Sequence, residues 1–162
     1  MPHEKPKTPR HTKASALHEE WTAEREARRL RLISLVESSF RDVRLGSGVS
    51  LHQARAMDDY RDDATIAAAR ALDPEERWQE TSGEKLVRLS DTLPFMDAQG
   101  FRLHLPRFML FALRNEDPGS WAGGAAISSC DLRGISAERL AILSAEQRQA
   151  IQAFSEFYAD EV

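Results

Sequence analysis

Four aspartates form the densest acidic cluster of the sequence: Asp58, Asp59, Asp62 and Asp63. On a helix, residues four apart share a face, so the cluster would give two pairs of carboxylates. Crowded carboxylates can bind a hard cation or raise each other's pKa, but a calcium-binding loop needs a central glycine that this segment lacks. We therefore expect no metal site. The cluster is either a set of helix caps on a solvated acidic surface or a face that attracts a basic protein partner.

Asp97, Arg102 and His104 are a second set of polar residues that lie close together in the sequence. Arg102 could hold an anion through two guanidinium nitrogens, and His104 could exchange protons near neutral pH. Asp59 could add a further carboxylate to such a pocket. The same residues could instead make structural hydrogen bonds, so a ligand pocket is one of two interpretations.

Cysteine and histidine chemistry is sparse. Cys130 is the only cysteine, which excludes an internal disulfide, and the five histidines are too scattered to complete a zinc site. Nothing next to Cys130 would lower the pKa of its thiol, so we expect a buried residue and not a nucleophile. The phosphate loop, the dinucleotide fingerprint, the zinc-protease motif and the nucleophile elbow are all missing, so no cofactor is expected and an enzyme is the less favoured class.

The tryptophans fall in contrasting surroundings. Trp78 follows an apparent helix start and is expected in the core. Trp21 lies in a highly charged stretch, and an exposed tryptophan there would indicate a partner contact. Trp121 is expected in a loop of glycines and small residues over 117–126.

Charge is unevenly distributed along the 162 residues, whose net charge is −4. Residues 1–13 carry +3, which leaves −7 for residues 14–162. The acidic body makes nucleic acid an unfavoured partner, although the basic tail could contact phosphates weakly. No apolar run is long enough to span a membrane and no secretory leader is visible, so we expect a cytoplasmic protein.

Helical patterns dominate the chain. Proline and glycine are absent from about residue 14 to residue 43, where Val36, Phe40 and Val43 share a helix face. A last helix is predicted to begin at Ser144, which has the spacing of a capping box with Gln147. We expect a short extended segment at 101–105, before a helix opened by Pro106, and a short helix after Asp73-Pro74. The predicted fold is mainly α: a disordered basic tail (1–13), then a single compact multi-helix domain (14–162) with at most one or two very short strands.

Several motifs occur in a fixed order: the glycine-containing run 43–51, Asp59-Tyr60, Trp78, the uninterrupted run 97–109 with its D-x-x-G-F-R-x-x-L-P centre, and the closing segment 143–147 with Phe154. This series resembles a family of small bacterial proteins of unknown function, the domain of unknown function numbered 6714, over about residues 30–160. The resemblance implies a compact, mostly helical cytosolic domain and carries no known activity.

Two classes of function follow. The favoured one is a non-enzymatic protein-interaction module, of the kind of an immunity or antitoxin-like inhibitor, that binds a basic partner such as a toxin through the four aspartates and Trp21. The alternative is a small-ligand binder or an enzyme with a polar site near Asp97, Arg102 and His104. A nucleic-acid accessory role of the tail ranks third.

Overall fold

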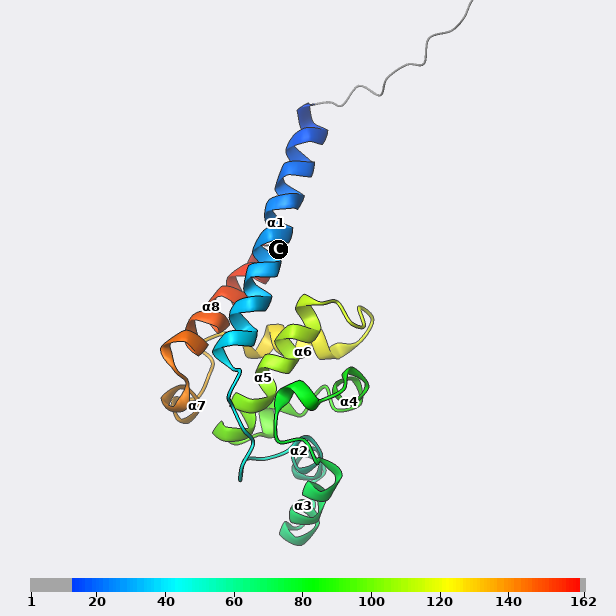
Figure 1. Ribbon diagram of the computed structural model, residues 1–162. Helices are drawn as coiled ribbons and strands as arrows, with labels where there is room; N and C mark the ends of the chain where they lie inside the picture. Colours follow the sequence, from blue (N-terminus) through cyan, green and yellow to red (C-terminus); the bar gives the residue numbers. More distant parts are fainter. Residues whose placement is uncertain (1–12, 161–162) are drawn as a thin grey trace, which may run out of the picture.

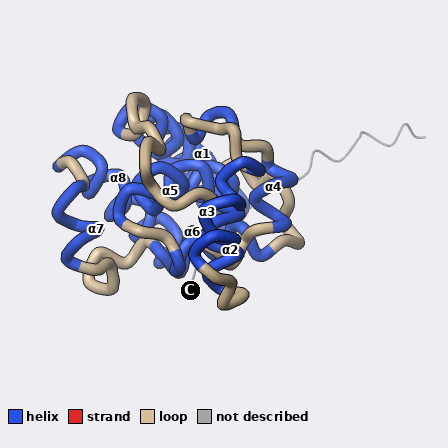
Figure 2. The backbone as a smooth tube through the Cα atoms, turned by 90° about the horizontal axis from the view of Figure 1, so that it is seen from below, coloured by secondary structure: helices blue, strands red, loops and turns tan. Residues whose placement is uncertain are grey.

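The computed structural model describes residues 13–160, with side chains from Thr22 onward, and every regular element in that part of the chain is helical (Figures 1 and 2). Residues 1–12, most of the predicted tail, lie outside it, and Lys13 is the first residue of the first helix. The elements, in chain order, are α1 (Lys13–Ser39), α2 (Leu51–Asp58), α3 (Asp63–Ala69), η1 (Arg70–Leu72), η2 (Trp78–Glu80), α4 (Gly83–Arg88), η3 (Leu93–Phe95), α5 (Ala98–Leu113), α6 (Trp121–Ser129), α7 (Ala137–Ile142) and α8 (Ala145–Ala159), where η marks a 3₁₀ helix.

The first and last helices pack against each other. Val36 of α1 and Phe40, directly after its end, are fully buried, and Phe154 of α8 is buried with them. The Nε2 of Gln147 donates to the carbonyl of Ser39 at 3.1 Å, so the N-terminal turn of α8 also meets the C-terminal end of α1. α1 ends at Ser39, four residues before the predicted boundary, and Gly46 adopts a φ of +53° in the loop that follows.

The central element is α5, which corrects the extended segment predicted at 101–105. This helix is continuous through Pro106, and most of its residues are buried on every side. A helix that is apolar all round can only be an interior helix, so the alternation of Phe101, Leu103 and Leu105 with polar residues is not a strand pattern. The side chain of Asp97 caps the helix by accepting from the backbone N–H of Gly100 at 2.8 Å.

The stretch predicted as a loop at 117–126 contains the first turns of α6, which is a second correction. Ala122 and Ala126 are fully buried one turn apart. α6 packs against α5, where a Cβ at Gly123 would meet the Cβ of Ala112 at 3.5 Å. Close packing between small side chains therefore outweighs the poor helix propensity of the glycines.

The D-x-x-G centre has a structural role. Asp97 Oδ1 also accepts from the N–H of Val49 at 2.9 Å, which ties the loop before α2 to the start of α5. A Cβ at Gly100 would lie 2.3 Å from the carbonyl oxygen of Val49. Only glycine lets the loop approach the helix this closely.

We expect Gly100→Ala to lower the free energy of unfolding by about 1–3 kcal/mol, because the backbone of the loop must move to accept the methyl group. Gly124→Ala is the matched control: a Cβ there meets nothing within 4 Å, so the better helix propensity of alanine should add about 0.5–1 kcal/mol. Urea unfolding of both variants measures the difference, and equal stabilities would refute the close approach.

Candidate functional site

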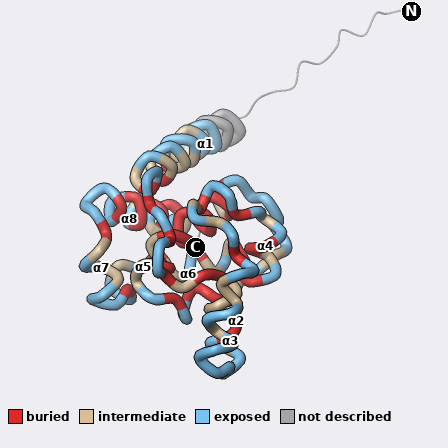
Figure 3. Tube along the Cα trace, turned by 60° about the horizontal axis from the view of Figure 1, so that its bottom comes forward, coloured by how far each residue is buried: buried red, intermediate tan, exposed pale blue. Residues whose placement is uncertain are grey.

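The acidic cluster lies on a hairpin formed by α2 and α3, which stands out from the rest of the molecule (Figure 3). Asp62 caps α3 by accepting from the N–H of Thr65 at 2.8 Å, and hydrogen bonds with the side chain and the backbone of Thr65 lower the pKa of Asp62. Asp58 forms an ion pair with Arg55 at 3.3 Å. Asp59 and Asp63 are exposed. One aspartate of the cluster therefore caps a helix, and two others leave their carboxylates open to solvent.

Tyr60 is the most exposed large side chain of the hairpin, at 96% of its full accessible area. Its backbone has a φ of +54°, in the left-handed region that costs a non-glycine residue free energy. Met57 of α2 is also exposed, as is Leu72 of η1 directly after the hairpin, and α3 contains no buried residue. The hairpin thus combines negative charge with apolar surface that the described part of the chain leaves uncovered.

Arg55 fixes the hairpin to the body. Its guanidinium forms an ion pair with both carboxylate oxygens of Asp91, which precedes η3, as well as the contact with Asp58. Asp91 and Arg55 are 36 residues apart, so this bridge joins α2 to a distant segment of the chain.

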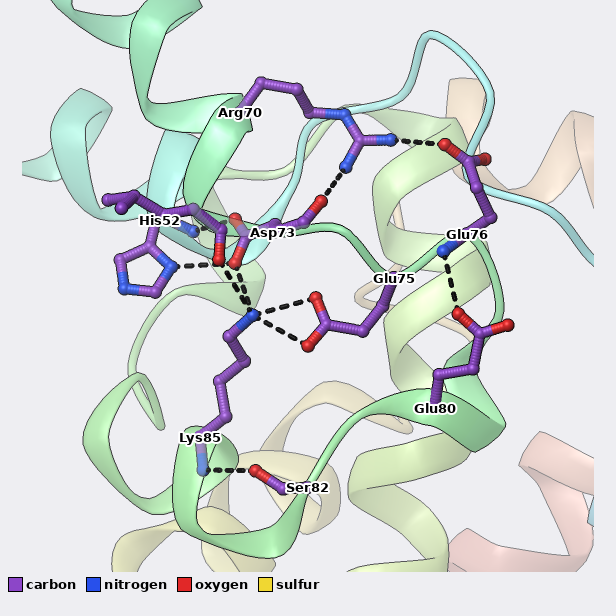
Figure 4. A network of polar contacts seen from close by, with 9 residues as sticks. His52, Arg70, Asp73, Glu75, Glu76, Glu80, Ser82 and Lys85 are labelled. Atoms are coloured by element: carbon purple, nitrogen blue, oxygen red, sulfur yellow. Dashed lines mark hydrogen bonds and ion pairs between the residues drawn. The ribbon is translucent and has the colours of Figure 1, made fainter.

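A network of buried charges holds the other end of the hairpin (Figure 4). Asp73, only 4% exposed, accepts from the backbone N–H of His52 at 2.7 Å, and its second oxygen lies 2.7 Å from His52 Nδ1. Lys85 Nζ lies 2.8 Å from both Asp73 and Glu75. These contacts join α2, the segment after η1, and α4.

The network changes the ionisation of its members. Burial alone would raise the pKa of Asp73, but hydrogen bonds from Lys85, Ser50 and His52 outweigh it and lower that pKa to about 2. Burial alone would lower the pKa of Lys85, but its bonds to Asp73 and Glu75 raise it. Both groups are therefore charged near neutral pH and satisfied by each other, so they support the site without being available for proton transfer.

Asp73 does not begin a helix, which corrects the prediction for the segment after it. The next element is η2, starting at Trp78, and the carboxylate of Asp73 turns inward instead of capping residues 74–76. Sequence reasoning missed the network because Lys85 is twelve residues further on. The one sequence feature that indicated a buried lysine was the position of Lys85 directly before the apolar pair Leu86-Val87.

The structure does not bring Asp97, Arg102 and His104 round one cavity. Asp97 caps α5, and Arg102 donates to the carbonyl of Ile142 at 3.0 Å and to Gln99 Oε1 at 3.0 Å. His104 is two residues further along the same helix, which turns it to the opposite side. There it is buried with its Nδ1 2.7 Å from the carbonyl oxygen of Gly100, and burial lowers the pKa of His104 to about 4. Of the three, only Arg102 lines a groove, of about 400 Å³.

Three other residues can be placed. Cys130 is fully buried, and burial raises the pKa of its thiol, as expected of an inert cysteine. Trp78 is in the core and donates from its indole nitrogen to the carbonyl of Phe40 at 2.8 Å. Trp21 belongs to α1, but its side chain lies outside the described residues.

Neither a metal site nor a membrane span emerges from residues 13–160. No group of three or more histidine, cysteine or acidic side chains there is placed to hold a metal ion. None of the helices in the same range has the length and apolarity needed to cross a membrane.

The fold and the site define a small helical protein with an exposed acidic hairpin whose base is held by ion pairs. The chain belongs to a family of unknown function, DUF6714, whose model matches residues 28–162. No curated protein and no solved structure shows significant similarity to it.

Proposed function

We propose that this protein is a non-enzymatic interaction module that binds a basic protein partner through the α2–α3 hairpin. The observation that carries the proposal is the composition of the hairpin: Tyr60 is 96% exposed between four aspartates. The function that fits this surface is inhibition by occlusion, as in an immunity or antitoxin-like protein that neutralises a basic toxin.

Two physical effects support this proposal. Clustered carboxylates attract a basic surface and speed its association, and the −7 charge of residues 14–162 acts in the same direction. Exposed tyrosine and tryptophan side chains are the anchors that most often dominate binding energy at protein interfaces. The base of the hairpin is held by Arg55–Asp91 and by Asp73–Lys85, so little order must be gained on binding.

The test is affinity purification of the tagged protein from its native host. The variant combines Asp59→Lys with Asp63→Lys, because the described structure records no ion pair or cap for either side chain. The matched control combines Asp42→Lys with Glu138→Lys and changes the net charge by the same amount. Asp42 lies in a different loop, and Glu138 lies in the first turn of a different helix, α7.

We expect a stoichiometric basic partner with the wild type and with the control, and a loss of about tenfold or more in affinity for the variant. Raised salt should weaken the wild-type complex. Equal retention of the partner by the variant, or recovery of no stoichiometric partner, would refute the proposal.

A further inference from the structure

A groove of about 530 Å³ lies between α6 and the segment around η3. One wall is the outward face of α6, with Trp121, Gly124 and Ser128. The other wall contains Asp91, Leu93 and Pro94. The residues of the α6 wall are three and four apart, so they form one continuous stripe along the helix.

Trp121 marks one end of this groove. Its side chain is 84% exposed at the first turn of α6, and it lines the groove. An exposed tryptophan at a surface groove is typical of a protein-binding site.

The stripe on α6 is shallow. A Cβ at Gly124 would meet nothing within 4 Å, so the groove is open above that residue. Small side chains one turn apart allow a second helix to approach closely, because the distance between packed helix axes depends on the side chains at the contact. The shape therefore fits a helix better than an extended chain.

The charge around the groove favours a basic helix over a second copy of this chain. Asp91 is the one charged residue among those that line the groove, and Arg55 bridges it to Asp58 of the hairpin. α2 packs against η3, and η3 packs against α6, so groove and hairpin belong to neighbouring elements. A second copy of this chain would bring another acidic body against this face, whereas a basic helix would complement it.

We propose that this groove is a docking site for an amphipathic helix of the basic partner, with an apolar side chain packed on Trp121 and Gly124 and basic side chains toward the carboxylates of the neighbouring hairpin, since Asp91 is already paired with Arg55. The inference rests on the proposed function and adds a second, apolar contact to it. The hairpin attracts the partner, and the groove buries part of it.

The experiment uses fluorescence anisotropy of a labelled amphipathic helical peptide built from leucine and lysine, titrated with the full chain. Gly124→Leu places a large side chain in the groove from a position where a Cβ meets nothing within 4 Å, and Gly124→Ala is the control that raises helix propensity but leaves the groove open. We expect saturable binding to the wild type and to Gly124→Ala, and a loss of about tenfold with Gly124→Leu and with Trp121→Ala. Thermal unfolding confirms that each variant is folded.

The hairpin variant Asp59→Lys with Asp63→Lys, in the same titration, separates this proposal from the proposed function. If that variant binds more weakly while Gly124→Leu binds like the wild type, the groove proposal is overturned and the acidic hairpin stands. If neither changes binding, or if the peptide does not bind, both lose support. A wild-type dimer that Gly124→Leu converts to a monomer would assign the groove to a second copy and overturn the proposal.

Discussion

Replacing Lys85 by methionine is expected to lower the free energy of unfolding by about 3–5 kcal/mol, the usual cost of removing one member of a buried ion pair. The ammonium group is almost completely buried and lies 2.8 Å from the carboxylates of Asp73 and Glu75. Methionine keeps the length of the side chain but leaves the charge of Asp73 in the interior without its cation. Urea unfolding followed by the fluorescence of buried Trp78 measures the loss.

Two further variants show whether the effect comes from the charge. The double variant Lys85→Met with Asp73→Asn should lose clearly less than the sum of the two single changes, because the unpaired charge is gone. Arg133→Met removes an exposed partner of Asp131 and should change stability by less than about 0.5 kcal/mol. A Lys85→Met loss as small as that of Arg133→Met would contradict the structural role of the network.

Acid should destabilise the protein well before its carboxylates are protonated, because of His104. Burial lowers the pKa of this histidine from 6.5 to about 4. In that interval the unfolded chain binds a proton that the folded chain does not, so stability falls as the pH falls. The shift corresponds to a loss of about 3 kcal/mol between pH 6.5 and pH 4.

Unfolding free energies measured across this range test the prediction, with His104→Gln as the control that removes the titrating group and should flatten the slope. The contribution of Asp73 to the free energy of unfolding is lost in a lower pH range. Its ionised form stabilises the fold above its unfolded pKa of about 3.9, and that contribution is lost as the pH falls through about 2. A His104 resonance that titrates near pH 6.5 in the folded protein would contradict the buried, neutral imidazole.

The helical class and the capping box at Ser144 were predictable, because each depends on local spacing. The centre of the fold was not. α5 is buried on all sides, so the one-sided periodicity that identifies a surface helix is absent, and Pro106 adds a misleading signal. α6 forms because Ala122 and Ala126 pack on α5, a long-range contact that the propensities of its glycines oppose.

The candidate site, too, was only partly predictable from the sequence. Composition alone located the acidic cluster, since like charges gathered in one segment are visible in any sequence. The exposure of Tyr60 and Trp121, and the inward turn of Asp73 toward Lys85, depend on how distant segments pack. His104 and Arg102 looked like partners because they are two residues apart, but a helix places such residues on opposite sides.

The most direct test of the proposed function is the dissociation constant of the purified partner for the wild type, for Asp59→Lys with Asp63→Lys, and for Asp42→Lys with Glu138→Lys, measured by calorimetry at two salt concentrations. We expect the hairpin variant to bind about tenfold or more weakly than the other two proteins and to lose most of the salt dependence. Equal dissociation constants for all three proteins, unchanged by salt, would show that the acidic hairpin is not the binding surface.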